Sequence, residues 1–192
     1  MKVIFLDIDG VLSPHSKFAP DSAHFPYHVA FSPTAVQNLK NILEKTGAKL
    51  VLSSRWVDRL GFTSTALVLA SHGITGPYVI GQDVSKNKND AVSPSDWLSD
   101  KGGKFWGVTI PPKKMSSDKC HEISFWLSDY ADKIKGYCVI DDDFIAGQED
   151  YQIQTNGEVG ITEKDAEKII EMLNSGMKKY KDKIAEHKKR YK

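Results

Sequence analysis

The stretch VIFLDIDGV, residues 3–11, decides the fold of this chain. Its first four residues form a continuous apolar run, which is typical of a strand buried on both faces in the middle of a parallel sheet. The run ends at Asp7, and a second acid, Asp9, and Gly10 follow within three residues, so we predict a turn there. Ligands bind at the carboxyl ends of the strands in an open α/β sheet, and this turn is therefore the first candidate site.

Strand and helix patterns alternate downstream of this first strand. Ser32 and Pro33 predict the beginning of a helix that ends near Gly47, and Lys49 followed by the apolar residues 50–52 predicts the next strand, over residues 49–52. Farther along, the apolar periodicity predicts helices over residues 57–72 and 119–130, strands over residues 78–80, 136–140 and 151–154, and a last helix that begins at Thr162 with Asp165 in the capping-box position. This alternation predicts an α/β fold with three layers, α/β/α, around a doubly wound, mostly parallel sheet.

The composition is that of an ordinary globular protein. The chain has 192 residues, of which 40% are hydrophobic and 27% charged, and this excludes a disordered or fibrous protein. We expect a single domain over residues 1–176. Within it, residues 84–118 are rich in proline, glycine and aromatic residues, among them Trp97 and Trp106. They are too long for an ordinary connection, so we interpret them as an irregular insertion that forms a lid or a small cap.

The net charge of +1 hides an uneven distribution along the chain. Residues 177–192 hold eight basic and two acidic residues, a net charge of +6, and the rest of the chain holds 18 basic and 23 acidic residues, a net charge of −5. We predict that residues 177–192 form a basic helical tail. This tail is either a solvated helix or a contact for the phosphates of a nucleic acid, so nucleic acid is a candidate partner.

The sequence predicts a soluble protein of a reducing compartment. The apolar run before Asp7 is much shorter than a signal peptide or a membrane span. Cys120 and Cys138 are too few for a disulfide framework and lack the paired spacing of a zinc site, so we expect reduced thiols. We therefore expect a cytoplasmic protein without a membrane partner.

Polar residues follow three of the predicted strands at their carboxyl ends. These residues are Asp7 and Asp9 after the first strand, Ser53 and Ser54 after the second, and Asp141, Asp142 and Asp143 after the strand over residues 136–140. If the strands are neighbours, at least four carboxylates share one small pocket, and like charges at that spacing stay ionised only around a cation. Hard oxygen ligands favour Mg²⁺, which commonly shares its remaining positions with a phosphate. The acids thus predict Mg²⁺ as a cofactor and a phosphoryl group as a ligand.

The positions of these residues indicate roles in phosphoryl transfer. Asp7 is placed to attack phosphorus and form an aspartyl-phosphate. Asp9, two residues on, is placed to protonate the leaving oxygen and later to deprotonate water. Ser53, backbone N–H groups and Lys119 are candidates to hold the phosphoryl oxygens. Ser53 is preferred to Ser54 because it directly follows the apolar strand.

Other polar and aromatic residues have alternative interpretations. Lys119 is preferred to Lys113 and Lys114 because it opens the helix that leads to the strand over residues 136–140. Ser54 and Arg55 are candidate substrate-binding residues, although Arg55 either clamps a substrate phosphate or pairs with a surface acid. Trp56 and Trp126 are interpreted as core residues. The loop histidines His15, His24 and His28 either reach the phosphate from the loop or are incidental, and four oxygen ligands make them unnecessary for the metal.

Four motifs together resemble those of the haloacid dehalogenase (HAD) superfamily phosphatases, in the order of that family. They are DIDGV (residues 7–11), LVLS (residues 50–53), Lys119 and VIDD (residues 139–142). The resemblance covers residues 2 to about 174 and implies the Rossmann-like HAD fold, with Asp7 as nucleophile and Asp9 as general acid and base. It also implies a Mg²⁺ site made by Asp7, Asp141 and Asp142, with Asp143 as a weaker candidate beside the metal. A backbone carbonyl completes the set, either that of Ile8 or that of Asp9, which is usual in the family.

A narrower resemblance is carried by five short segments. They are SSRW (residues 53–56), HGI (72–74), EISFWL (122–127), DDD (141–143) and GIT (160–162). Together they look like the small HAD domains associated with RNA-repair proteins, which implies a nucleotide or a nucleic-acid terminal phosphate as the substrate. That family usually runs directly from the third strand to the lysine helix, so residues 84–118 depart from its pattern.

Two functions from different classes follow from these patterns. The first is an enzyme, a Mg²⁺-dependent HAD-type phosphatase that hydrolyses the phosphomonoester of a small molecule, a nucleotide or a nucleic-acid end through an aspartyl-phosphate. The second is a binding module that takes Mg²⁺ and a phosphorylated ligand or a nucleic-acid end without turnover, with a receiver-like domain as a variant. Asp9 favours the enzyme, because neither a binding site nor a stable phosphoaspartate needs an acid and base at that position.

Overall fold

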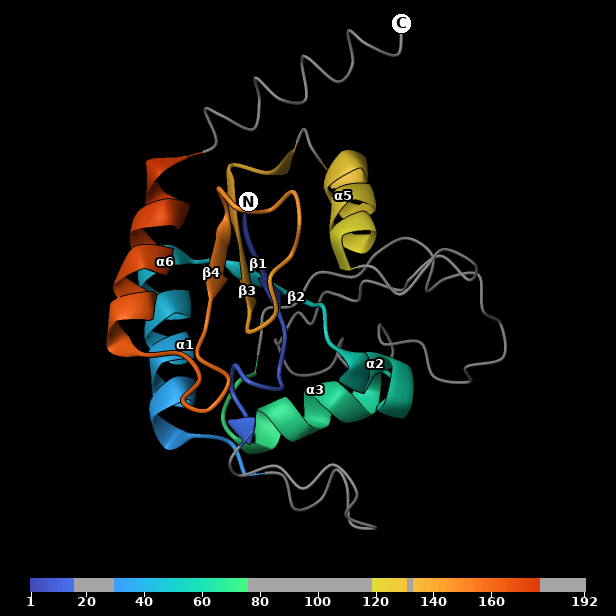
Figure 1. Cartoon of the computed structure of the whole chain (residues 1–192), viewed down its shortest axis with the longest axis vertical. Coiled ribbons are helices and arrows are strands. Elements are labelled where there is room, and N and C mark those ends of the chain that lie inside the picture. Colours follow the sequence, from blue (N-terminus) through green and yellow to red (C-terminus); the bar gives the residue numbers. More distant parts are fainter. Residues whose placement is uncertain (16–29, 76–118, 131–132, 177–192) are drawn as a thin grey trace, which may run out of the picture.

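The computed structural model describes residues 1–15, 30–75, 119–130 and 133–176 (Figure 1). The elements in chain order are β1 (Lys2–Leu6), α1 (Pro33–Thr46), β2 (Lys49–Leu52), α2 (Arg55–Leu60), α3 (Phe62–Ser71), α5 (Lys119–Tyr130), β3 (Gly136–Asp141), β4 (Gln152–Gln154) and α6 (Glu163–Ser175). The predicted strand over residues 78–80, the insertion over residues 84–118 and the basic tail lie outside the described residues.

The four strands form one parallel sheet in the order β2-β1-β3-β4. Leu6, the last residue of β1, lies opposite Leu52 of β2 on one side and opposite Ile140 of β3 on the other. The carboxyl ends of β2, β1 and β3 are therefore level and adjacent. The residues that follow these three strands emerge at the same edge of the sheet, as the sequence predicted.

Helices cover both faces of the sheet (Figure 1). On one face, Ile4 and Leu6 of β1 belong to a core cluster that includes buried residues of α1 and α6. On the other face, Val3 and Phe5 pack in a second cluster with α5, where the Phe5 ring meets the Trp126 ring edge to face at 5.3 Å. This alternation along β1 confirms a central strand buried on both faces. The predicted three-layer α/β/α fold with a parallel sheet is confirmed.

The predicted helix over residues 57–72 is wrong, because the structure has two helices there. Gly61 separates α2 from α3 with a φ of +75°, a conformation that does not continue a helix. The first of the two helices begins at Arg55, directly after the two serines that follow β2. Figure 1 shows both helices beyond the carboxyl ends of the strands, so α2 is part of the rim of the candidate site.

The predicted helix ends agree with the structure where the capping residues define them. The Ser32 hydroxyl accepts a hydrogen bond from the backbone N–H of Ala35, and α1 ends at Gly47, which has a φ of +62°. Thr162 and Asp165 form a complete capping box at the beginning of α6. Within the described ranges, every helix is too short or too polar to cross a membrane.

Candidate active site

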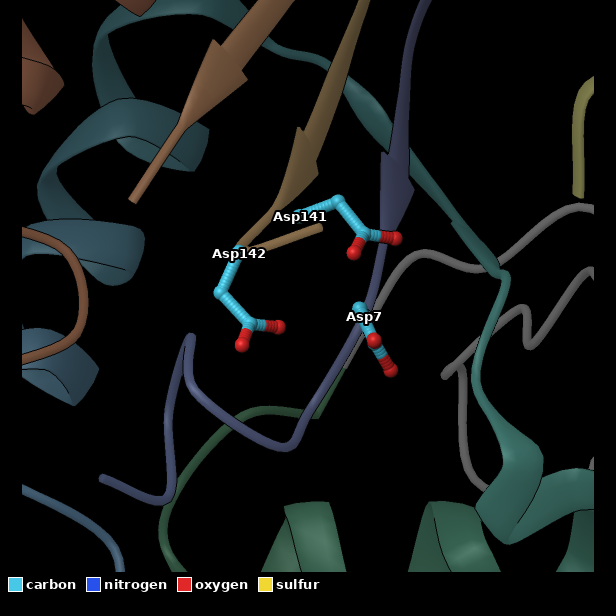
Figure 2. A group of neighbouring side chains, drawn as sticks. All are labelled: Asp7, Asp141 and Asp142. Carbon is cyan, nitrogen blue, oxygen red and sulfur yellow. The ribbon is translucent and has the colours of Figure 1, made fainter. Parts of the chain in front are cut away.

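Three acidic side chains from two strand ends converge at the carboxyl edge of the sheet. Asp7 directly follows β1, Asp141 is the last residue of β3, and Asp142 comes next. Each of the three offers a carboxylate oxygen, and these oxygens lie within 4.8 Å of one another. Figure 2 shows the carboxylates directed into one space between the strand ends. The convergence follows from the strand order, because β1 and β3 are neighbours although they are far apart in the sequence.

The side chain of Lys119 forms ion pairs with two of the three converging carboxylates. This lysine is the first residue of α5, and its Nζ atom donates to Oδ2 of Asp7 at 2.5 Å and to Oδ2 of Asp141 at 2.7 Å. Burial alone would lower the pKa of the Lys119 ammonium, but the charges of Asp7 and Asp141 outweigh burial and raise this pKa above its usual range. Lys119 is therefore charged at neutral pH. The competing candidates Lys113 and Lys114 lie outside the described residues.

Asp141 is the most deeply buried acid of the group. Its Oδ1 atom accepts a hydrogen bond from the backbone N–H of Asp143 at 3.0 Å, and its Oδ2 atom contacts Lys119. Burial raises the pKa of the Asp141 carboxyl to about 7, the nearby charge of Asp7 adds to this effect, and Lys119 opposes it. Asp143 is exposed and contributes a backbone N–H, and its carboxylate is not among the three that converge.

The donor set fits a hard divalent cation. Three carboxylates and one ammonium leave an excess of negative charge at a place that is largely closed to water. Ionised carboxylates in such a place need a compensating cation. All of the converging side-chain ligands are carboxylate oxygens, which suit Mg²⁺ better than a softer metal.

The carboxylate of Asp9 lies apart from this group. Its Oδ1 atom accepts a hydrogen bond from the indole Nε1–H of Trp56 at 2.9 Å. Burial raises the pKa of the Asp9 carboxyl above its usual value, the bond from Trp56 opposes that rise, and the charge of Asp7 adds to it. The sequence assigned Trp56 to the core, and the side chain is indeed fully buried, but its contact with Asp9 was missed.

The two serines after β2 have different surroundings. The Ser54 hydroxyl is the N-cap of α2 and accepts a hydrogen bond from the backbone N–H of Trp56. The Ser53 hydroxyl is buried, and within the described part of the chain it has no hydrogen-bond partner. A buried hydroxyl without a hydrogen-bond partner lowers the stability of the fold unless a ligand supplies the partner. Arg55, the first residue of α2, is exposed at the rim.

His15 contacts one of the converging acids, although the sequence assigned it no role. Its Nε2 atom lies 2.8 Å from Oδ2 of Asp142, and this hydrogen bond raises the pKa of the imidazole above its usual value. The backbone N–H of His15 donates to the carbonyl of Gly157, and a Cβ atom at Gly157 would come within 2.6 Å of the imidazole ring. His24 and His28 lie outside the described residues.

The turn after β1 depends on Gly10. This residue has a φ of +66°, and a Cβ atom built there would lie 2.3 Å from the carboxylate carbon of Asp142. The hydroxyl of Thr155 donates to the Gly10 carbonyl at 3.0 Å and ties the turn to the segment after β4. Gly10 therefore allows the backbone after β1 to approach Asp142 closely.

Gly10→Ala is expected to destabilise the protein by about 1–3 kcal/mol and to weaken Mg²⁺ binding, because it adds strain at a positive φ and displaces the Asp142 carboxylate. Urea denaturation and calorimetric titration measure the two effects. Gly47→Ala is the matched control, since Gly47 has a similar φ of +62° but open space around its Cβ position. Equal Mg²⁺ affinities of the two variants would contradict the prediction.

A parallel sheet between helices, with two aspartates after its central strand and a lysine and further aspartates beside them, is the architecture of HAD-type hydrolases. Residues 3–166 match the family described as the HAD domain in Swiss Army Knife RNA repair proteins, and the chain belongs to this family. The match confirms that the chain is a HAD-superfamily domain of the RNA-repair type, as the sequence resemblances indicated. No curated protein and no solved structure matches the chain.

Proposed function

We propose that the protein is a Mg²⁺-dependent phosphatase that hydrolyses phosphomonoesters through an aspartyl-phosphate on Asp7. The observation that carries the proposal is the different environment of two acids only two residues apart. Asp7 lies in the charged group and contacts Lys119, whereas Asp9 lies outside that group and contacts an indole. Two carboxyl groups in unlike surroundings are suited to a nucleophile and a general acid, respectively.

Asp7 and Asp142 are the proposed side-chain ligands of the metal, with Asp141 beside them. The carbonyl of Asp9 is the proposed backbone ligand, because the carbonyl of Ile8 already accepts hydrogen bonds from the N–H groups of three residues. These donors are Val11, Leu12 and Ser13. Bound there, the ion would neutralise the carboxylates and polarise the phosphoryl oxygens.

The chain's own residues account for the proposed proton and phosphoryl transfers. A carboxylate oxygen of Asp7 attacks phosphorus, and the ester bond breaks as Asp9 gives its proton to the leaving oxygen. Asp9 then takes a proton from water, which attacks the phosphorus and restores the Asp7 carboxylate with release of phosphate. Lys119 and the Ser53 hydroxyl donate hydrogen bonds to the phosphoryl oxygens in both steps.

The proposed substrate is a nucleotide or the terminal phosphate of a nucleic acid. The family description, which names RNA repair proteins, supports this class. Arg55 at the exposed beginning of α2 is a candidate contact for a further phosphate of such a substrate. The net charge of +6 on residues 177–192 also favours a polyanion, through phosphate contacts that weaken as salt is added.

A phosphate-release screen tests the proposal. The panel holds p-nitrophenyl phosphate, sugar phosphates, mononucleotides, and oligonucleotides with a 3′ or a 5′ phosphate, each with Mg²⁺ and with excess chelator. We expect release that requires Mg²⁺ and is fastest for the nucleotide or oligonucleotide substrates. Binding of these ligands without release from any of them would leave a binding module as the function instead.

A further inference from the structure

A hydrogen bond between the turn after β1 and the first turn of α2 links the proposed acid and base, Asp9, to a buried tryptophan. The Trp56 side chain is fully buried, and its indole Nε1–H donates to Oδ1 of Asp9 at 2.9 Å. We propose that Trp56 is a positioning residue, which fixes the direction of the Asp9 carboxylate for proton transfer to the leaving oxygen. This inference rests on the proposed function and adds to it the residue that makes Asp9 an effective acid.

The local fold holds the indole in one orientation. β2 ends at Leu52, and α2 begins three residues later, so Trp56 lies in the first turn of that helix. The N-cap Ser54 binds the backbone N–H of Trp56, and the Phe31 ring packs against the indole with centroids 5.9 Å apart. β1 and β2 are neighbours in the sheet, so the loop that carries Asp9 lies beside this helix turn. A donor held by packing and by a cap is preorganised for its acceptor.

Burial of an indole does not by itself explain the bond to Asp9. Trp126 is also buried, and its Nε1–H has no hydrogen-bond partner within the described ranges. Its ring packs edge to face on Phe5 and stacks on Tyr130. Of the two tryptophans that the structure describes, the one beside the acidic site is the one whose N–H reaches a carboxylate. Trp126 is therefore a natural reference for Trp56.

The bond has two consequences for the carboxylate of Asp9. The indole N–H binds Oδ1 and thereby sets the direction of Oδ2. This direction matters because a general acid must point toward the oxygen that it protonates. The bond also engages a carboxylate that is not among the three that converge, those of Asp7, Asp141 and Asp142. Without the indole, the carboxylate would lose this restraint and turn among several directions.

The first test compares Trp56→Phe with Trp126→Phe on esters that need an acid to different degrees. An alkyl phosphate has a poor leaving group, which must be protonated, and 2,4-dinitrophenyl phosphate has a good one, which need not be. For Trp56→Phe we expect kcat/KM to fall by about 10-fold or more on the alkyl ester and much less on the dinitrophenyl ester, with KM nearly unchanged. Asp9→Asn should show the same selectivity with a larger loss, about 10²- to 10⁴-fold on the alkyl ester.

Trp126→Phe removes the same atoms from a buried position and should affect the two esters equally. An equal loss on both esters for Trp56→Phe would assign Trp56 a structural role only and overturn the inference. If the wild type releases phosphate and Trp56→Phe has the same kcat/KM as the wild type on both esters, the role of Trp56 is refuted and the proposed function stands.

The second test does not depend on activity and keeps Trp56 in place. The indole N–H signals are recorded by NMR for the wild type and for Asp9→Ala, and the Trp56 and Trp126 signals are assigned from triple-resonance spectra of the isotope-labelled wild type. We expect the Trp56 signal to move and its hydrogen to exchange faster in Asp9→Ala, and the Trp126 signal to stay. An unchanged Trp56 signal would show that the bond to Asp9 is not formed, whether or not the protein is a phosphatase and whether or not Trp56→Phe folds.

Discussion

Asparagine in place of Asp7 is expected to abolish phosphate release, with a fall in kcat of about 10⁴-fold or more. The amide has the shape of the carboxylate but is not a nucleophile, so the covalent step is lost. The fold should persist, because Lys119 keeps its bond to Asp141 and the amide oxygen can still accept from the backbone N–H of Ile8. Phosphate release and the mass of acid-quenched protein measure the effect, since the wild type should carry a phosphoryl group and Asp7→Asn should not.

The control for this experiment is Asp143→Asn. Asp143 belongs to the same run of acids, but its side chain is exposed and its carboxylate lies outside the converging group. This variant should retain most of the wild-type kcat and should be phosphorylated on Asp7. Turnover by Asp7→Asn at a rate near that of the wild type would rule out the aspartyl-phosphate and point to direct attack by water.

Alanine in place of Asp142 is expected to weaken Mg²⁺ binding by about 100-fold or more. Even the loss of a residue that only supports a metal ligand lowers metal affinity by about 10- to 100-fold. Asp141 is already engaged by Lys119 and by the backbone of Asp143, whereas the partner of Asp142 is the half-exposed His15. We therefore expect the metal to depend strongly on Asp142. Calorimetric titration of Mg²⁺ into the purified protein measures the affinity.

Thermal unfolding supplies an independent measure of the same loss. Mg²⁺ at 100 times its dissociation constant should stabilise the wild type by about 2.7 kcal/mol, and at the same concentration it should stabilise Asp142→Ala by well under 1 kcal/mol. Asp143→Asn should respond as the wild type does. If Mg²⁺ stabilised Asp142→Ala as much as the wild type, the proposed ligand set would be wrong.

The strands and the helix caps were predictable because their signals are local. The strand predicted over residues 49–52 coincides with β2, and Pro33 begins α1 as its sequence position indicated. Thr162 and Asp165 satisfy the backbone N–H groups at the beginning of α6 within four residues of one another. Gly61 was missed because the apolar periodicity continues across it, whereas its positive φ interrupts the helix.

Side-chain contacts between segments far apart in the sequence could not be predicted in the same way. The bond from Trp56 to Asp9 spans 47 residues, and the contact of His15 with Asp142 spans 127. Each depends on the order of strands in the sheet and on where the adjoining turn ends, and neither leaves a periodic pattern in the sequence. The choice between Ser53 and Ser54 was likewise a question of where β2 ends, and the N-cap of α2 distinguishes the two hydroxyls.

The position of β1 in the sheet has a consequence for the order in which the site is assembled during synthesis. β1 pairs with β3, whose residues follow in the chain more than 130 positions later. A ribosome that has made Asp7 must still add more than 130 residues before Asp141, Asp142 and β3 become available to it. A nascent chain thus carries the proposed nucleophile without the proposed metal ligands, and the proposed site is complete only when the long-range pairing that slows folding has formed.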